Sequence, residues 1–353
     1  MTGVGDRIPV NVITGFLGSG KTTLLNRLLR APESSGVAIL VNELGEVGLD
    51  HDLLVRVDDS TVVLQGGCVC CTIRDDLALA MRELHRKRER GEVPAFARLA
   101  IETTGLADPA PILYTLLTEP VLCHRYRLSN VVTTVDALHA ASGLDEYPEC
   151  TGQVALADRL IITKDDLSDA GSLAALESAL KRINPAAPVF RENRDRPAAG
   201  ELLAGDVLDP ASRGDEVRRW IAEQATAAAT RAPLEAGTPR HGRDVAAICL
   251  VLEGALDWSA FGIWLTMLLH RYGRRVLRVK GLLNVAGLQA PVLVQCVQHT
   301  IHPPVHLAAW PSSDQRSRLV LIVESLARER LLHSLDAFNR LGAGDGDARI
   351  ANR

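Results

Sequence analysis

The chain has 353 residues, of which 47% are hydrophobic, and carries a formal net charge of -4. This length predicts about two domains, each with an apolar core of its own. The small acidic charge gives no electrostatic argument for a nucleic-acid partner, and the most apolar long stretch, residues 246–269, contains Glu253 and Asp257, so no membrane span is expected.

The amino-terminal residues lack the charged and apolar segments of a secretory signal, so a cytoplasmic protein is predicted. The chain has seven cysteines, an odd number that does not favour a disulfide framework. Four of them are scattered singly and are expected to be small buried hydrophobic residues: Cys123, Cys150, Cys249 and Cys296.

The first predicted element is an apolar strand over residues 8–13, which runs into a glycine-rich turn and an amphipathic helix. The turn fits the P-loop pattern G-x-x-x-x-G-K-[ST], in which backbone N–H groups and a lysine surround phosphate oxygens and a hydroxyl ligates Mg²⁺. A glycine-rich turn without a ligand is the alternative. The predicted nucleotide-binding residues are Gly15, Phe16, Leu17, Gly18, Ser19, Gly20, Lys21, Thr22 and Thr23.

Residues 36–41 form a short apolar run typical of a strand buried in a parallel sheet. The strand brings Asn42, Glu43, Gly45 and Glu46 to its carboxyl end, and a polar segment with Asp50 and His51 follows. This segment lies where nucleotide switches carry their first mobile loop, although an ordinary solvated loop fits equally well.

A strand over residues 61–64 precedes three thiols within four residues, Cys68, Cys70 and Cys71, and residues 74–90 then read as a helix. Thiolates are soft ligands suited to Zn²⁺ or Cu(I), and three of them leave one tetrahedral position open. Structural zinc sites are usually closed by four ligands, so an incomplete set suits a metal that must leave. A buried cysteine cluster without metal and a redox dithiol are the alternatives.

A strand over residues 96–101 ends in Glu102, and Gly105 follows three residues later. An acidic residue at the end of a hydrophobic strand has the form of a Walker-B acid, and the glycine could offer a backbone N–H to the γ-phosphate. Asp108 is expected to cap the next helix.

Two further strands are predicted over residues 130–135 and 159–162. The second delivers Thr163, Lys164 and Asp166, which resemble the guanine-reading motif N-K-x-D with threonine replacing asparagine. A carboxylate at Asp166 can accept hydrogen bonds from two guanine donors that adenine lacks, while the stem of Lys164 covers the base. A plain polar turn is the alternative.

The composition shifts to Pro, Gly, Ala, Arg and Asp after residue 192, which predicts a linker over residues 193–243 with one helix near 209–230. A smaller α+β domain is expected over residues 244–341, built from strands at 245–253, 275–284, 292–298 and 317–324 and helices at 258–272 and 327–341. A disordered tail is expected from residue 342. Three histidines in this domain are expected to be surface residues: His299, His302 and His306.

The order of these motifs, including N-E-L-G-E, G-G-C-V-C-C, E-T-T-G-L-A-D-P and T-K-D-D-L, resembles the CobW family of P-loop GTPases, and within it the YjiA-like members. Residues 278–281 and 292–298 are similar to the family's C-terminal domain. The resemblance implies an α/β P-loop GTPase domain over residues 1–192, and a metallochaperone or metal-responsive regulator that hydrolyses GTP.

Carried to this sequence, the resemblance implies GTP as substrate, Mg²⁺ at Thr22 and Glu102, and Lys21 and Glu102 as catalytic residues. A transferable Zn²⁺, or a similar ion such as Co²⁺, would bind Cys68, Cys70 and Cys71. A client metalloprotein, and a homo-oligomer, are the expected partners, without nucleic acid or membrane. The chain lacks the histidine-rich tract, and the cysteine-containing docking motif before the P-loop, that relatives carry.

Three hypotheses follow. In the first, a slow GTPase controls metal affinity through its nucleotide state, with Glu43, Glu46 and His51 as additional ligands that move relative to the thiolates. In the second, the protein buffers zinc or cobalt and uses GTP only structurally. A factor that loads cobalt or iron in a cofactor pathway, such as that of cobalamin, is a third hypothesis.

Overall fold

The computed structural model describes residues 7–34, 36–41, 63–65, 73–204, 214–215, 217–218, 220–221 and 245–342. The chain divides into two compact units. The first comprises Met1–Leu180 with Ala187–Glu216, and the second comprises Lys181–Ala186 with Val217–Arg353. The domain boundaries at residues 192 and 243 stay predictions, because part of the intervening chain lies outside the described residues.

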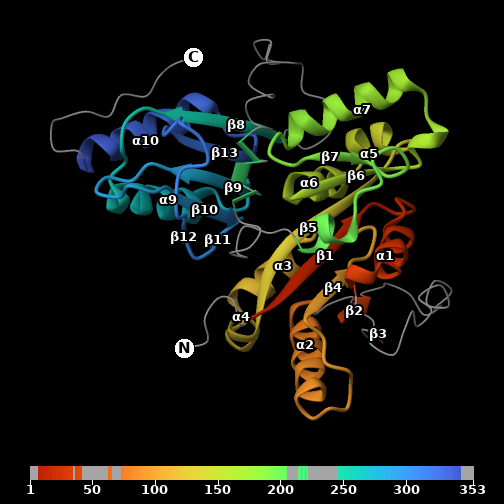
Figure 1. Ribbon diagram of the computed structural model, residues 1–353. Coiled ribbons are helices and arrows are strands. Elements are labelled where there is room, and N and C mark those ends of the chain that lie inside the picture. Colours follow the sequence, from red (N-terminus) through yellow and green to blue (C-terminus); the bar gives the residue numbers. More distant parts are fainter. Residues whose placement is uncertain are drawn as a thin grey trace. The chain divides into compact units, whose positions relative to one another are not determined.

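The first unit is built on a seven-stranded sheet with the order β3-β2-β4-β1-β5-β6-β7, shown in Figure 1. All neighbouring strands in it are parallel. In chain order the strands are β1 Ile8–Gly15, β2 Val37–Val41, β3 Val63–Gln65, β4 Arg98–Glu102, β5 Tyr126–Asp136, β6 Arg159–Thr163 and β7 Val189–Arg191. The carboxyl ends of all seven therefore meet at one edge of the sheet.

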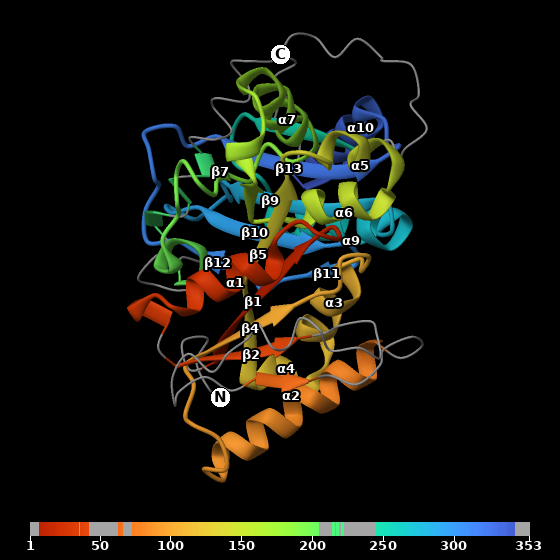
Figure 2. The ribbon, with the colours of Figure 1, turned by 90° about the vertical axis from the view of Figure 1, so that its right-hand side faces the viewer.

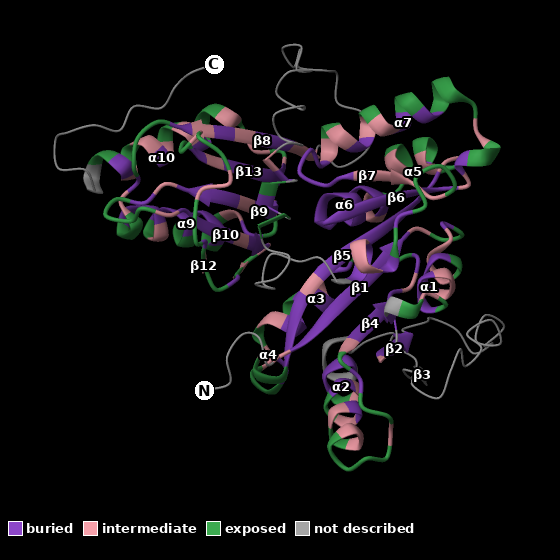
Figure 3. Cartoon of the chain, in the orientation of Figure 1, coloured by how far each residue is buried: buried purple, intermediate pink, exposed green. Residues whose placement is uncertain are grey.

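The strands read as continuous apolar runs because helices and loops cover both faces of a parallel sheet. Every residue of β1, β2 and β6 is buried, as Figure 3 shows for the central strands. The helices that connect the strands are α1 Lys21–Leu29, α2 Ile73–Glu89, α3 Ala110–Thr118, α4 Pro120–Arg125, α5 Ala140–Glu146, α6 Pro148–Leu156 and α7 Ala170–Ile183. Three-residue 3₁₀ helices lie at Pro32–Ser34 and Asp165–Leu167.

Helix α1 packs on one face of the sheet. Its Leu25 and Leu29 contact Ile13 and the apolar residues of β2, and its Leu24 and Leu28 contact Val132 of β5. Helix α6 lies over the opposite face, where the hydroxyl of Thr133 donates to the carbonyl of Gln153 at 3.0 Å. Figure 2 shows the same layers from the side.

The start of the predicted linker is packed chain. A π-helix, Gly200–Ala204, lies against α1 through Ala199, Leu202 and Leu203, all of which are buried. Strand side chains satisfy its carbonyl groups: Asn11 donates to Leu203 O at 3.0 Å and Arg159 to Glu201 O at 2.9 Å. The polar and alanine-rich composition of this segment concealed the few leucines that anchor it.

The second unit contains an antiparallel sheet of order β11-β10-β9-β13-β8, with β12 paired to β10. Helices α9 and α10 pack on one face around Trp264, whose indole N–H donates to Ser334 at 3.0 Å. The elements are β8 Val245–Leu252, α9 Trp258–Tyr272, β9 Val276–Leu283, β10 Val292–Val297, β11 Thr300–Ile301, β12 Val305–His306, β13 Ser317–Glu324 and α10 Arg328–Gly342.

The predicted fold class is confirmed: a parallel α/β sheet is followed by a smaller α+β module. Helix α3 begins at Ala110, two residues beyond the predicted cap, although the Asp108 carboxylate does accept the Ala110 N–H at 2.9 Å. His299 and His306 are exposed as expected, whereas the prediction for His302 is wrong, because it is 6% exposed. Among the described helices, none combines the length and apolarity that crossing a bilayer requires.

Leu202→Ala should lower the free energy of unfolding by about 2–5 kcal/mol, because the side chain is 0% exposed and leaves a cavity against α1. Urea denaturation followed by circular dichroism measures the change. Leu167→Ala is the control, since that side chain is 64% exposed, and it should stay within about 0.5 kcal/mol of the wild type. Equal stability of the Leu202 variant and the wild type would contradict the packing of this segment on the first sheet.

Candidate nucleotide-binding site

The glycine-rich turn after β1 has backbone geometry that only glycine meets at its key points. Gly18 and Gly20 have φ angles of 67° and 86°, in the left-handed region. A Cβ on Gly15 would lie 2.3 Å from the hydroxyl of Thr134, so β5 closes directly under the loop. The cap residue of α1 is Gly20, which has no side chain to occupy the first N–H groups of the helix. These groups suit an anion.

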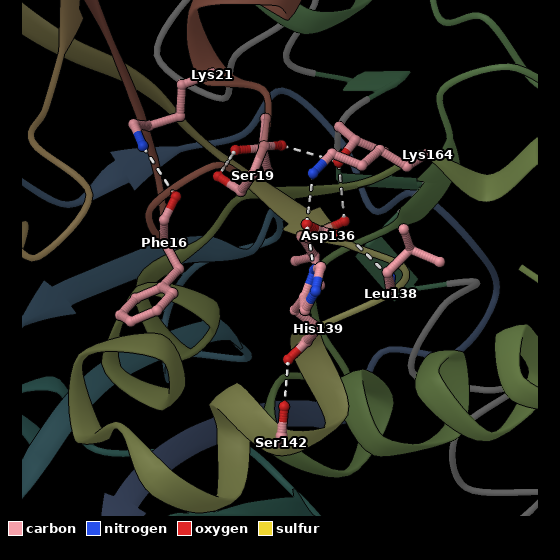
Figure 4. Close-up of polar contacts among 11 residues, drawn as sticks. Phe16, Ser19, Lys21, Asp136, Leu138, His139, Ser142 and Lys164 are labelled. Atoms are coloured by element: carbon pink, nitrogen blue, oxygen red, sulfur yellow. Dashed lines mark hydrogen bonds and ion pairs between the residues drawn. The ribbon is translucent and has the colours of Figure 1, made fainter. Parts of the chain in front are cut away.

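Lys21 folds back across the loop that it follows. Its ammonium donates to the carbonyl of Gly15 at 2.9 Å and to that of Phe16 at 3.0 Å. Figure 4 shows the contact with Phe16. The charged end of Lys21 therefore lies over the mouth of the turn, where phosphate oxygens would compete for it.

The structure brings Thr22 and Glu102 together, as the sequence predicted for a magnesium site. The Thr22 hydroxyl donates to the Glu102 carboxylate at 2.5 Å, and Glu102 is 3% exposed at the end of β4. The parallel pairing of Ile13 with Glu102 produces this proximity. A hydroxyl and a carboxylate oxygen are hard ligands of the kind that Mg²⁺ prefers, so this pair fits the ion.

Gly105 lies against the P-loop. A Cβ at this position would approach the backbone N and Cα of Leu17 to 2.7 and 2.8 Å, so no other residue fits without displacing the loop. Upstream, the Thr103 N–H donates to Ile13 O at 2.9 Å. The segment after β4 is thus in contact with the phosphate cradle, where a γ-phosphate contact is predicted.

Thr163 ties the predicted base-reading loop to the P-loop. Its hydroxyl donates to the Ser19 carbonyl at 2.8 Å, and its side chain is buried. Ser19 is in turn hydrogen bonded to Thr134 through their hydroxyls at 2.7 Å. The hydroxyl hydrogen of Thr163 is used within the protein. Direct contact of Thr163 with a base stays a prediction.

Asp136, at the end of β5, was missed by sequence reasoning. Its carboxylate accepts from the Lys164 ammonium at 2.6 Å, His139 Nδ1 at 3.1 Å and the Leu138 N–H at 2.8 Å (Figure 4). Burial raises the pKa of Asp136, but the hydrogen bonds from Lys164, Leu138 and His139 outweigh it and hold the pKa below its ordinary value. An acid ending a buried strand is the same signal that identified Glu102.

Lys164 and Asp166 are presented by an unusual turn. Lys164 has a φ of 56°, which is rare for a residue with a side chain and marks a constrained loop. Asp166 is exposed, and one of its oxygens accepts from the Asn193 amide at 2.7 Å. The same amide donates to Asp165 at 3.0 Å, so Asn193, which follows β7, holds both carboxylates. No pattern in the sequence pointed to Asn193.

A cavity of about 40 Å³ lies behind the P-loop, bordered by Phe16, Leu17, Asp136, His139 and Cys150 among others. Burial raises the pKa of the Cys150 thiol to about 11, so this thiol stays protonated at neutral pH. Phe16 also stacks on Tyr147, with ring centroids 4.8 Å apart. The four scattered cysteines are free thiols; Cys150 and Cys296 are buried as expected, whereas Cys123 and Cys249 are only half-buried.

The predicted metal motif and switch loop lie outside the described residues, namely Asn42, Glu43, Gly45, Glu46, Asp50, His51, Cys68, Cys70 and Cys71. In the part of the chain that the structure describes, no group of three or more His, Cys, Asp or Glu side chains could hold a metal ion. The role of these residues as ligands therefore stays a prediction.

Two family models match the chain. The nucleotide-binding domain of the CobW/HypB/UreG family matches residues 9–191, and the C-terminal domain of the cobalamin synthesis protein cobW matches residues 245–339. The predicted resemblance to the CobW family is thereby confirmed in both halves of the chain.

Several relatives have related sequences. The zinc chaperone YjiA of Escherichia coli is 32% identical over 331 residues, which cover 92% of this chain and 96% of that protein. The zinc chaperone CobW of a Sinorhizobium species is 28% identical, with 90% and 92% covered. The zinc-regulated GTPase metalloprotein activator 1 of Schizosaccharomyces pombe is 33% identical over 198 residues, covering 54% of this chain and 47% of that protein.

A solved structure shares the whole architecture. The Zn(II)-bound YjiA GTPase from E. coli superposes with a TM-score of 0.66 and 27% sequence identity, and the match covers 94% of this chain and 99% of that one.

Asp136→Asn should lower the free energy of unfolding at pH 7 by about 1–3 kcal/mol, the range for a hydrogen bond to a charged group. Because the folded pKa is depressed, this stabilisation is present above the unfolded pKa of about 3.9 and is lost as the pH falls through the folded value. The gap between the variant and the wild type should therefore narrow below about pH 4. Urea denaturation at several pH values measures it.

Asp145→Asn is a matched control, since Asp145 is exposed on α5 near the same loop, and should change stability by less than about 0.5 kcal/mol. A loss at the Asp136 variant that is the same at pH 3 and pH 7 would contradict the charge-based explanation.

Proposed function

Because the chain belongs to the CobW/HypB/UreG family of nucleotide-binding proteins, we propose that it hydrolyses GTP and uses its nucleotide state to control the binding and delivery of Zn²⁺. The observation that carries the proposal is the Thr22–Glu102 contact, which joins a phosphate cradle to the edge of the sheet from which the thiol segment departs. The relatives are named zinc chaperone or zinc-regulated GTPase, and these names support both the GTPase part and the zinc part of the proposal.

The phosphates of GTP would bind the turn from Gly15 to Thr23. No side chain caps the first turn of α1, and the Lys21 ammonium would exchange its two loop carbonyls for β- and γ-phosphate oxygens. The exchange is favourable because charge-assisted hydrogen bonds to phosphate are stronger than those to neutral carbonyls. Lys21 thus neutralises charge that grows as water attacks the γ-phosphorus.

Thr22 and Glu102 would hold Mg²⁺, since their oxygens are already adjacent. When bound there, Mg²⁺ would neutralise phosphate charge. In this chain Glu102 is buried, so its carboxylate is held in place by β4 and is available at one defined position.

Asp166 and Lys164 would select guanine. The exposed Asp166 carboxylate offers acceptors for the two donors on guanine, and Asn193 restricts its orientation. Asp136 holds the ammonium of Lys164 at one side, which leaves the aliphatic stem to lie along the base.

Zn²⁺ would be the cargo, bound by the thiolates of Cys68, Cys70 and Cys71. The register supports communication with the nucleotide: Gln65 pairs with Val41, and Val41 pairs with Glu102. With strands about 4.8 Å apart, β3 ends roughly 10 Å from the backbone of Glu102. The segments after β2 and β3, which carry Glu43, Glu46, His51 and the thiols, therefore start close to the γ-phosphate site.

A client metalloprotein would receive the ion. An incomplete thiolate set leaves a coordination position for a ligand of the partner, and the name of the S. pombe relative, a metalloprotein activator, supports such a client. A homo-oligomer remains part of the proposal.

Asp166→Ala should abolish the preference for guanine over adenine nucleotides, a loss of about tenfold or more in the ratio of their Kd values, because unpaired donors cost about 1–3 kcal/mol. Titration with GTP and ATP analogues measures the ratio. Asp169→Ala is the control, since that exposed residue caps the start of α7 by accepting the Gly171 and Ser172 N–H groups. A wild-type protein that binds both nucleotides equally would refute the assignment of Asp166.

Cobalt substitution should give strong visible absorption from a tetrahedral Co²⁺–thiolate centre, and Cys68→Ser, Cys70→Ser and Cys71→Ser should each weaken it. Affinity should fall at lower pH, because thiolates must lose protons to bind. Cys123→Ser and Cys249→Ser are controls that should leave the spectrum unchanged.

The same titration, repeated with GDP and with a non-hydrolysable GTP analogue, tests the coupling. The proposal expects a different spectrum or Kd in the two nucleotide states, reversed when GDP replaces the analogue. Identical values would favour a metal buffer in which GTP is only structural.

A further inference from the structure

Gln153 of α6 makes contacts that neither the motifs nor the proposed mechanism assign. Its side chain is 1% exposed. The amide nitrogen donates to two carbonyl oxygens of the segment after β4, Gly105 O and Ala107 O, both at 3.1 Å. A primary amide has two N–H donors, so both are used on this one segment.

The backbone of Gln153 is itself anchored. Its carbonyl accepts from the hydroxyl of Thr133, in β5, at 3.0 Å. Thr133 is 1% exposed and lies in the strand that also forms the floor of the P-loop through Thr134. A change in the path of residues 105–107 would therefore break hydrogen bonds at a rigid and buried support.

The segment is held on its other side by the P-loop. Leu17 lies so close to Gly105 that a Cβ on the glycine would clash with it. Within the segment, the Ala107 N–H donates to Thr104 O at 3.1 Å, which forms a turn around the exposed Leu106. Gly105 thus lies between Leu17 on one side and the amide of Gln153 on the other.

We propose that Gln153 is a positioning residue for recognition of the γ-phosphate: it fixes the peptide groups around Gly105 so that the Gly105 N–H is presented to the third phosphate. The inference rests on the proposed GTPase function. The inference goes beyond that function by assigning the discrimination between GTP and GDP to a buried amide that contacts no nucleotide. A fixed donor pays no ordering cost when the phosphate arrives, which is the advantage of preorganisation.

A merely structural glutamine would behave differently. If the amide only filled and satisfied the core, its loss would lower stability and weaken GTP and GDP binding alike. A residue that positions the Gly105 N–H affects the binding of GTP, which carries a γ-phosphate, and not that of GDP. The ratio of the GTP and GDP affinities therefore separates the two roles.

The test is Gln153→Met, which keeps the side-chain length and removes both donors. Kd values are measured for a non-hydrolysable GTP analogue and for GDP, both with Mg²⁺. We expect the analogue to bind about tenfold more weakly and GDP to bind within about twofold of the wild type. The variant would weaken one hydrogen bond to the nucleotide, that from the Gly105 N–H to the γ-phosphate, which GDP lacks. Turnover of GTP at saturation should fall as well.

Thr151→Val is the matched control. Thr151 lies two residues earlier on α6, is 5% exposed, and donates from its hydroxyl to Leu144 O at 3.2 Å. The variant therefore also removes a buried hydrogen bond of α6, but none to residues 105–107, and it should keep the wild-type affinity ratio. Gln153→Glu is a second test variant: it keeps the volume and polarity and cannot donate to both carbonyls, so the ratio should fall again.

Each outcome decides. A folded Gln153→Met or Gln153→Glu protein with the wild-type ratio overturns the role of Gln153 and leaves the GTPase intact. Equal weakening of both nucleotides, or failure of both variants to fold, assigns Gln153 a structural role and overturns the inference. A wild-type protein that binds neither nucleotide overturns the proposed function itself, together with the role of Gln153.

Discussion

The parallel pairing of β1 with β4 is the constraint on which the site depends. It sets Ile13 beside Glu102, and the chain after β1 then turns so that the first residues of α1 lie above the acid. The 2.5 Å contact between Thr22 and Glu102 follows from that register. A shift of the pairing by one residue would turn Glu102 to the other face of the sheet, because side chains alternate along a strand. The apolar residues Val10, Val12 and Ile13, all 0% exposed, oppose such a shift.

The other side of the phosphate cradle is held by β5 and β6. Thr134 bonds the Ser19 hydroxyl and Thr163 bonds the Ser19 carbonyl, so one P-loop residue is tied to two strands. The loop is therefore rich in glycine yet fixed on both sides, which gives it a defined shape. The hydrogen bond from Thr163 also connects the predicted phosphate cradle to the predicted base-reading loop.

Many of the strands, one helix and part of the candidate site could be predicted from local sequence patterns. Apolar runs identified β1, β2, β4 and β6, the lone acid at a strand end identified Glu102, and α9 was predicted at its observed bounds, Trp258–Tyr272. These features are encoded within a few consecutive residues.

The missed features have a common cause. The side chains of Asn193 and Gln153 and the π-helix Gly200–Ala204 have hydrogen-bond partners 27 to 192 residues away in the chain, and Asp136 binds Lys164, 28 residues away, as well as its neighbours Leu138 and His139. Gln153 lies in α6, a helix with no exposed residue, and a polar glutamine gives no sign in the sequence that its amide is buried against Gly105. His302 was likewise expected at the surface because no carboxylate or cysteine lies near it in the sequence, and it is buried where β11 folds against β10.

The strand order explains how one edge of the sheet could serve two ligands. The connection after β1 runs over one face toward β2, whereas the connection after β4 runs over the other face toward β5. Adjacent strands whose connections diverge leave a crevice between them, and phosphate binds there in open α/β sheets. The base-reading residues lie on the β5 and β6 side of this crevice, and the thiol segment follows β3 on the other side. In the proposed function the base and the metal would be separated by β1 and β4, with the triphosphate end of the nucleotide between them. Guanine selection and metal control could then vary independently, and a signal from nucleotide to metal would pass through the γ-phosphate and the segments that contact it.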